Sequence, residues 1–276
     1  MNALAARMGK AVQYRTSSPL CDDQIRAIAP SVFAMEAHAS RSERYTYVPT
    51  IDVLSGLRKE GFQPFMVAQG RTRVPGKADF TKHMLRLRHA GDISASEANE
   101  IILINSHDGT SSYQMLAGVF RFVCCNGMVC GETIEDIRIK HSGDIVHNVI
   151  SGAFDVLDGF GIIREVTADM KQLTLTRPEQ VVFAEAALSI KHDDEDTTAP
   201  FDATALLSTR RAEDRDPSLW TTFNKIQENV VRGGIAGRNA NGRRTRTREV
   251  TAIDNNVKLN RALWTLAEKM AELKAA

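Results

Sequence analysis

Residues 100–130 read EIILINSHDGTSSYQMLAGVFRFVCCNGMVC, and this stretch decides the fold of the chain. Two turn signals divide it. Asp108-Gly109 separates the run EIILINSH from TSSYQMLAGVFRFVCC, and Asn126-Gly127 separates the second run from MVCGE. Asp-Gly and Asn-Gly tolerate the positive φ angles that two-residue hairpin turns require. The stretch therefore predicts three consecutive antiparallel strands.

The period-two pattern continues on both sides of this stretch. In FQPFMVAQGRTR (62–73) alternate residues share a face, and in TKHMLRLRHA (81–90) two leucines share one face while the basic residues share the other. The segment IRIKH (137–141) predicts one more short strand. Together these patterns predict an antiparallel meander of five or six strands over residues 62–141.

Helical patterns surround the predicted sheet. Capping residues and proline predict helix starts near Asp22, Pro49, Asp144, Pro178, Asp202, Asp216-Pro217 and Asp254. The predicted fold class is α+β: a central antiparallel β-meander with a packed helix, followed by a mainly helical C-terminal half. We expect an irregular N-terminal segment at 1–42, a sheet-plus-helix core at 43–160, and a helical part at 161–276 with a basic loop at 232–250. We expect these three segments to form one composite domain.

Composition excludes several protein classes. Of the 276 residues, 43% are hydrophobic and 25% are charged, and four are Cys, which excludes disordered, collagen-like and disulfide-framed chains. No run approaches the ~20 apolar residues that cross a bilayer. The first 20 residues contain no continuous apolar segment typical of a secretory signal. We therefore expect a cytoplasmic protein that does not enter a membrane.

Charge is segregated along the chain, although the net charge is only +1. Residues 71–90 hold six basic residues and one acid, and residues 232–248 hold six arginines and no acid. Residues 191–216 hold four basic residues and eight acids. Segregation of this kind produces strong local fields. Two basic segments and one acidic segment are the first indication of function.

The cysteines do not indicate a metal site. Cys124, Cys125 and Cys130 follow the pattern C-C-x4-C, which is not the spacing of zinc ligands. Adjacent residues on a strand point to opposite faces, so Cys124 and Cys125 cannot easily share one metal ion. Reduced, buried thiols are the expected state, and we expect neither a metal nor a cofactor.

Several uninterrupted blocks resemble a known family. They are NSHDGTSSYQMLAGVFRFVCCNGMVCG, TKHMLRLRHA, LWTTFNKIQENVVRGG and GRRTRTREV. With them the chain resembles the phage- and plasmid-like proteins of unknown function typified by YafZ, YfjQ and YubP, over most of residues 43–273. The resemblance implies a context of prophages, conjugative plasmids and other mobile elements. It implies no catalytic residues, because none are established for the family.

The leading functional hypothesis is a non-enzymatic protein that binds nucleic acid, with single-stranded DNA as the expected partner and strand annealing or protection as the role. The neutralisation of phosphate charges by basic side chains is the dominant, sequence-independent contribution to the free energy of such binding. The predicted contacts are Arg71, Arg73, Lys82, Arg86 and Arg88 on one exposed face of the sheet, Arg243, Arg244, Arg246 and Arg248 in a flexible loop, and Tyr113 as a stacking platform.

Two other hypotheses stay open. Ser106-His107-Asp108 lies at a predicted hairpin tip, where His107 and Asp108 could hold a divalent metal in a nuclease or hydrolase. Alternatively, the acidic segment 193–196 and the last helix could bind a host defence protein. The last helix carries an apolar stripe, through which we expect a homo-oligomer; it consists of Leu259, Leu263, Leu266, Met270 and Leu273.

Overall fold

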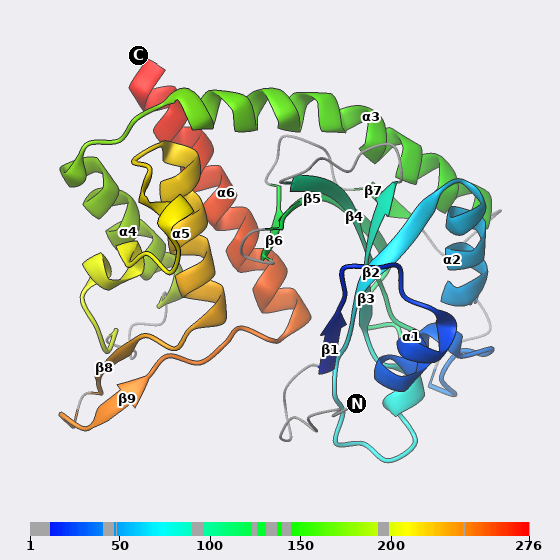
Figure 1. Cartoon of the computed structure of the whole chain (residues 1–276). Helices are drawn as coiled ribbons and strands as arrows, with labels where there is room; N and C mark the ends of the chain where they lie inside the picture. The colour runs from blue at the N-terminus through cyan, green and yellow to red at the C-terminus, as the bar shows by residue number, and fades with distance from the viewer. Residues whose placement is uncertain are drawn as a thin grey trace. The chain divides into compact units, whose positions relative to one another are not determined.

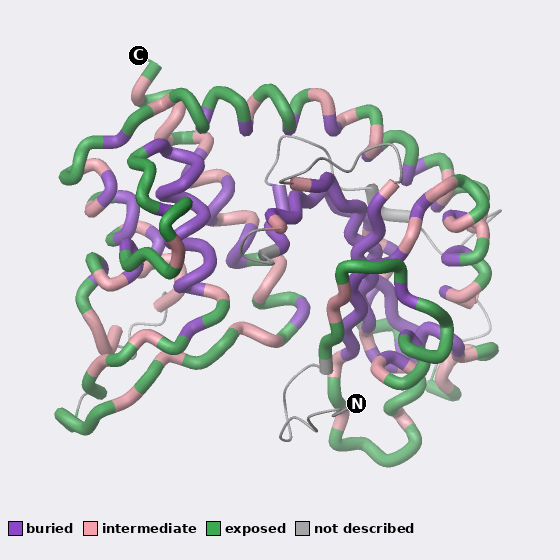
Figure 2. Tube along the Cα trace, viewed as in Figure 1, coloured by how far each residue is buried: buried purple, intermediate pink, exposed green. Residues whose placement is uncertain are grey.

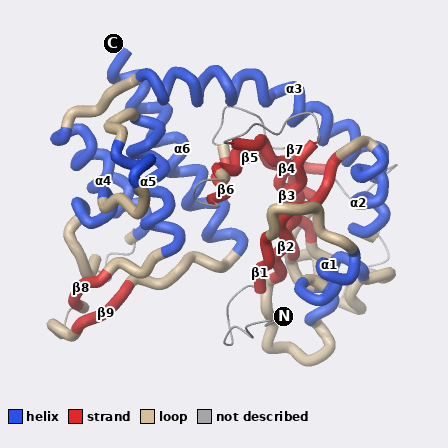
Figure 3. Tube along the Cα trace, in the orientation of Figure 1, coloured by secondary structure: helices blue, strands red, loops and turns tan. Residues whose placement is uncertain are grey.

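The structure, a computed structural model, describes residues 12–40, 47, 49–89, 97–122, 126–130, 137–139, 145–192, 199–239 and 241–275. An antiparallel sheet with helices is followed by a mainly helical region, which confirms the predicted α+β class (Figures 1 and 3). The chain divides into two compact units. Unit 1 holds residues 1–127, 134–160 and 251–253, and unit 2 holds residues 128–133, 161–250 and 254–276.

The sheet, most of which belongs to unit 1, is an antiparallel meander. Its strands are β1 (Val12–Arg15), β2 (Phe62–Gln69), β3 (His83–His89), β4 (Glu97–Asn105), β5 (Tyr113–Arg121), β6 (Asn126–Val129) and β7 (Ile137–Ile139). The first six follow one another in chain order across the sheet, and β7 pairs with β5. Strand β1, from the segment expected to be irregular, pairs with β2.

The two turn signals have different outcomes. Asp108-Gly109 does lie between β4 and β5, and Gly109 has a φ of +76°. The connection nevertheless spans residues 106–112, closed by the backbone N–H of Ser111, which donates to Ser106 Oγ at 2.8 Å. Asn126-Gly127 lies within β6 rather than at a turn, and residues 123–125 lie outside the described part of the chain.

Two helices form the apolar core of unit 1 with the sheet. Helix α2 (Thr50–Lys59) buries Val53, Leu54 and Leu57, and residues 145–160 of helix α3 (Ile145–Gln172) bury Val149, Ala153, Val156 and Phe160. These spacings of three and four residues place each set on one helix face. A Cβ at Gly56 would lie 2.9 Å from Ile150 Cδ1, so the glycine permits the close approach of α2 and α3. The unit also contains α1 (Asp22–Ile28) and the short helices η1 (Pro30–Phe33) and η2 (Ala78–Phe80).

Unit 2 is mainly helical. Besides residues 161–172 of α3, it contains α4 (Arg177–Lys191), η4 (Ala203–Leu207), η5 (Ala212–Arg215), α5 (Leu219–Arg232), most of α6 (Ile253–Ala275), and the strands β8 (Ala236–Arg238) and β9 (Arg244–Arg246). Thr176 and Glu179 form a capping box at the start of α4. Ser218 caps α5 by accepting a hydrogen bond from the N–H of Thr221.

Helix α5 is buried on all sides. Every residue from Leu219 to Val230 is buried, including seven polar or charged ones (Figure 2). Trp220 and Phe223 make edge contacts with Trp264 of α6, at ring-centroid distances of 6.3 and 5.9 Å. On α6, Leu259 and Leu263 are buried while Leu273 is 77% exposed, so only part of the predicted stripe faces the core. Assembly through this stripe stays a prediction.

Helix α3 is long and apolar enough to cross a membrane, by length and composition alone. Within that helix, however, Asp155 and Asp158 are exposed, and the buried residues form a single stripe. A buried stripe opposite exposed carboxylates is typical of a surface helix in a globular protein, although Phe154 and Ile162 of α3 are exposed as well. The structure is thus consistent with a soluble protein. Cys124, Cys125 and the acidic segment 193–196 lie outside the described residues.

Candidate nucleic-acid interface

A short β-hairpin of unit 2 carries most of the arginines of the second basic segment. In its antiparallel strands, Arg238 pairs with Arg244, Gly237 with Thr245, and Ala236 with Arg246. Opposite residues share a face of the ribbon, as do residues two apart on one strand. Arg238, Arg244 and Arg246 therefore lie on one face, which we call the arginine face. All three are exposed, whereas Gly237 and Thr245 on the other face are half-buried.

The turn of the hairpin is ordered by its own side chains. Asn239 Oδ1 accepts hydrogen bonds from the N–H groups of Asn241 (3.1 Å) and Arg243 (3.0 Å). Gly242 adopts a φ of +72°, and its carbonyl accepts a hydrogen bond from Arg238 Nη1 at 2.8 Å. The segment that the sequence predicts to be a flexible loop is therefore a hairpin, because backbone pairing and turn hydrogen bonds replace the apolar packing that it lacks.

The opposite face of the hairpin is set against the body of unit 2. A Cβ at Gly237 would lie 2.0 Å from the carbonyl oxygen of Pro200, so only glycine allows this approach. The N–H of Arg238 donates to the same oxygen at 2.8 Å. This contact directs the arginine face away from Pro200 and into solvent.

The base of the hairpin joins the end of α5. Gly233 ends the helix with a φ of +65°, and the N–H of Gly234 donates to Thr247 O at 2.9 Å. The N–H of Thr247 donates to Ile235 O at 2.9 Å, so the pairing extends beyond β9. Arg248 follows Arg246 by two residues and is also exposed. It continues the alternation of the arginine face.

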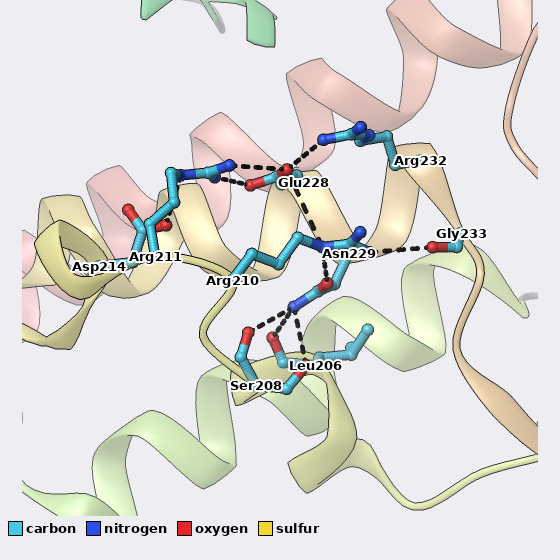
Figure 4. Close-up of polar contacts among 9 residues, drawn as sticks. All are labelled: Leu206, Ser208, Arg210, Arg211, Asp214, Glu228, Asn229, Arg232 and Gly233. Carbon is cyan, nitrogen blue, oxygen red and sulfur yellow. Dashed lines mark hydrogen bonds and ion pairs between the residues drawn. The ribbon is translucent and has the colours of Figure 1, made fainter. Parts of the chain in front are cut away.

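An arginine cluster surrounds Glu228 near this base (Figure 4). The carboxylate is 3% exposed and forms ion pairs with Arg211, with Arg232 at 2.7 Å and with Arg210 at 3.9 Å. Arg211 also pairs with Asp214 at 3.0 Å. Three guanidinium groups thus face two carboxylates. The cluster keeps an excess positive charge beside the hairpin while neutralising the buried glutamate.

Asn229 and Arg210 connect α5 to its surroundings. Asn229 Nδ2 donates to the carbonyl oxygens of Leu206 (2.9 Å) and Ser208 (3.0 Å), and Asn229 Oδ1 accepts from Arg210 Nε at 3.0 Å. Arg210 Nη2 donates to Gly233 O at 3.0 Å. Because Gly233 is the first residue after α5, this contact fixes the point from which the hairpin departs (Figure 4).

Arg86 and Arg88 are not on an exposed face, so that prediction is wrong. Each is 1% exposed, and both pair with Glu100, Arg86 at 3.0 Å and Arg88 at 2.9 Å. The guanidinium carbon of Arg88 lies 4.0 Å from the ring centre of Phe120 and 4.3 Å from that of Phe65. Aromatic rings from β2 and β5 therefore cover this face of the sheet. Strand alternation alone does not show which face is covered.

The other predicted contacts of unit 1 have mixed positions. Arg71 and Arg73 are exposed in the connection between β2 and β3, and Lys82 is half-buried before β3. A role for these three in binding stays a prediction. Tyr113 is 0% exposed, so its ring is not accessible to a base in this structure.

The carboxylate of Asp108 forms hydrogen bonds within its own turn and an ion pair with Lys77. Its Oδ1 accepts from the N–H (3.0 Å) and the hydroxyl (2.6 Å) of Thr110, and its Oδ2 pairs with Lys77 at 3.1 Å. Burial raises the pKa of this carboxyl, but the bonds from Thr110 and Lys77 outweigh it and lower the pKa below its usual value. Among the described residues, no group of three or more His, Cys, Asp or Glu is placed to hold a metal ion.

His107 belongs to a buried polar cluster with His83. Thr50 Oγ1, at the start of α2, lies 2.9 Å from His83 Nε2 and 3.4 Å from His107 Nε2, and it accepts from Asn105 Nδ2 at 3.0 Å. Tyr113 OH is 3.2 Å from the same oxygen. All five residues are 0% exposed. The cluster joins the ends of β3, β4 and β5 to α2.

The protonation of His83 follows from its neighbours. Ser31 Oγ donates to Gln69 Oε1 at 2.7 Å, so it accepts from His83 Nδ1 at 2.9 Å. His83 Nε2 then lacks a proton and accepts from the Thr50 hydroxyl. Burial, with a smaller effect of His107, lowers the pKa of His83 to about 3. The neutral ring therefore connects Ser31 and Thr50 through one donated and one accepted hydrogen bond.

Sequence reasoning missed Arg238 as a site residue and did not find the cluster around Glu228. The alternation R-x-R-x-R over residues 244–248 is a strand signal that could have indicated the hairpin and its paired arginine. The Glu228 cluster joins residues from η5, α5 and the segment before η5. No local spacing reveals such a set.

Comparisons with known proteins place the chain among uncharacterised relatives. The model of a domain of unknown function (DUF932) matches residues 37–264. UPF0380 protein YafZ of Escherichia coli (strain K12) is 50% identical over 270 residues, which cover 98% of both chains. UPF0380 protein YfjQ of the same strain matches with the same identity and coverage. No solved structure matches.

Proposed function

The chain belongs to the DUF932 family, and on the geometry of its hairpin we propose that it binds nucleic acid without cutting it. The arginine face is the observation that carries this proposal. Three exposed guanidinium groups share one face of a fixed ribbon, and the sequence from Arg232 to Arg248 contains no acid. Guanidinium groups bind phosphate through two parallel hydrogen bonds, which suits contacts with a nucleic-acid backbone.

The surroundings of the hairpin support the same function. The turn bonds of Asn239 and the contact with Pro200 hold the ribbon before any ligand arrives. A preordered site loses less conformational entropy on binding. The cluster around Glu228 fixes the hairpin base and adds Arg232, whose side chain is 55% exposed. We expect Arg248 and Arg232 to extend the arginine face, while Arg243, at the turn, adds positive charge beside it.

A metal-dependent nuclease has less support, because the turn and Lys77 already engage both oxygens of Asp108. The resemblance to phage- and plasmid-like proteins supports a role in protecting nucleic acid while a mobile element is transferred. We assign this activity to the cytoplasm.

Binding of the purified full chain to fluorescently labelled DNA, single-stranded and duplex, tests the proposal. Fluorescence anisotropy across about 50 to 200 mM salt should give a log–log slope of about −3 or steeper, since each neutralised phosphate contributes nearly one unit. Magnesium should not cause cleavage. Failure to bind either DNA at low salt would refute the proposal and favour a host protein as partner. Cleavage that depends on magnesium would favour the nuclease.

A further inference from the structure

We infer that the hairpin recognises the duplex form of nucleic acid, entering a groove as a two-stranded ribbon. This inference rests on the proposed function and concerns which form of nucleic acid the same site prefers. Antiparallel strands lie about 4.8 Å apart, and the major groove of B-form DNA, about 12 Å wide, admits a ribbon of two strands.

The arginine face carries a cross-strand pair of arginines at its centre. The N–H of Asn239 donates to Arg243 O and the N–H of Thr247 donates to Ile235 O. Hydrogen-bonded and non-hydrogen-bonded pairs alternate, so Arg238 and Arg244 form a non-hydrogen-bonded pair, in which side chains lie closest. Their side chains leave from opposite strands of the ribbon. A ribbon lying with this face toward a groove therefore presents two neighbouring arginines, one from each strand, to the groove and its phosphates.

The hairpin carries no aromatic residue of its own on which unpaired bases could stack. Proteins that hold single strands combine basic residues with exposed aromatic rings. The sequence from Gly233 to Val250 contains no aromatic residue. In unit 2, Trp220 is 3% exposed and Phe223 is 0% exposed, and the half-buried Phe201 lies beside Gly237, on the side of the hairpin opposite the arginine face. We therefore expect the hairpin to bind nucleic acid mainly through contacts with phosphates. These contacts are stronger with a duplex, because its charge density is higher than that of a single strand.

The test compares one DNA duplex of about two helical turns with each of its single strands, by anisotropy competition on the full chain. We expect the duplex to bind about tenfold tighter, the equivalent of one good charge-assisted contact. The salt slope should also be steeper for the duplex than for the single strands, because duplex DNA releases more counterions per contact.

A variant that breaks the ribbon but keeps every charge sharpens the test. Thr245 lies between the two hydrogen-bonded backbone contacts, so Thr245→Pro removes a ladder donor from β9. Thr245→Val is the matched control, since valine suits a strand and retains the N–H. We expect T245P to lose about tenfold in duplex affinity while its single-strand affinity stays at the level of T245V.

Several results would overturn the inference. Equal or tighter binding of single strands by the unmodified protein contradicts the duplex preference while leaving the proposed function intact. A T245P chain that loses both affinities equally contradicts the role of ribbon geometry. If T245P fails to fold, as judged by circular dichroism, the duplex preference of the unmodified protein decides the question. Absence of binding to any DNA refutes the proposed function as well.

Discussion

At the residue scale, buried charged side chains in unit 1 are stabilised by pairing with one another rather than by exposure to solvent. Glu100 is 0% exposed and receives charge-assisted bonds from both Arg86 and Arg88. A Cβ at Gly127 would lie 2.6 Å from Arg86 Nη1, so glycine makes room for the guanidinium. Removing one partner of such a buried set typically costs about 3–5 kcal/mol. These arginines therefore serve the fold, although their sequence pattern suggested a surface.

The buried histidine makes stability depend on pH. The pKa of His83 is about 3 in the folded chain and 6.5 as its ordinary value, so below pH 6.5 the unfolded chain binds a proton that the folded chain does not. The free energy of unfolding should fall by up to about 1.4 kcal/mol per pH unit between pH 6.5 and pH 3. Urea unfolding followed by circular dichroism measures this slope.

The difference between variants isolates the contribution of His83. His83→Gln should flatten the slope between about pH 6.5 and 5, where few carboxylates titrate. His147→Gln, at an exposed position on α3, is the substitution with which H83Q is compared. If the slope were identical in H83Q and in the unmodified protein, His83 would not be the cause of the loss of stability at acidic pH.

At the element scale, the hairpin depends on glycines for different reasons. Gly233 and Gly242 both have positive φ angles, +65° and +72°. A Cβ at Gly233 would lie 2.7 Å from the backbone of Arg248, whereas a Cβ at Gly242 meets nothing within 4 Å. Gly233→Ala should therefore cost about 3 kcal/mol and Gly242→Ala only about 1 kcal/mol.

Tryptophan fluorescence measures this difference selectively. Both tryptophans of the chain, Trp220 and Trp264, lie in the core of unit 2 and contact each other edge to face. Their emission during urea unfolding reports this unit. Equal destabilisation by the two substitutions would mean that the close approach of Gly233 to Arg248 does not hold the hairpin base.

Much of the fold could be predicted at this scale, because its signals are local. Alternation indicated strands β2 and β3, turn signals indicated β4 and β5, and Pro178 and Gly233 indicated helix ends. The turn at Asp108-Gly109 was located correctly, while Asn126-Gly127 proved to be strand residues. Gly127 is needed there for its contact with Arg86, a reason that a dipeptide signal does not contain.

At the scale of the whole molecule, the candidate site was only partly predictable. The run RRTRTR drew attention to Arg244 and Arg246, which are exposed, since clustered charge is visible in a sequence; their role in binding stays a prediction. Strand alternation gives two faces but not which of them other residues cover, so Arg86 and Arg88 were assigned to the surface. The division into two units depends on contacts between distant segments, such as residues 251–253 with unit 1.

Two variants of equal charge test the central claim most directly. R238Q/R244Q/R246Q removes the arginine face, and R71Q/R73Q/K82Q removes the same number of positive charges from unit 1. DNA-binding salt slopes are measured for both by anisotropy. We predict that the first variant lowers the steepness of the slope by about three, one for each phosphate contact, and that the second lowers it by less. Equal effects of the two variants, or a larger effect of the second, would contradict the assignment of binding to the hairpin.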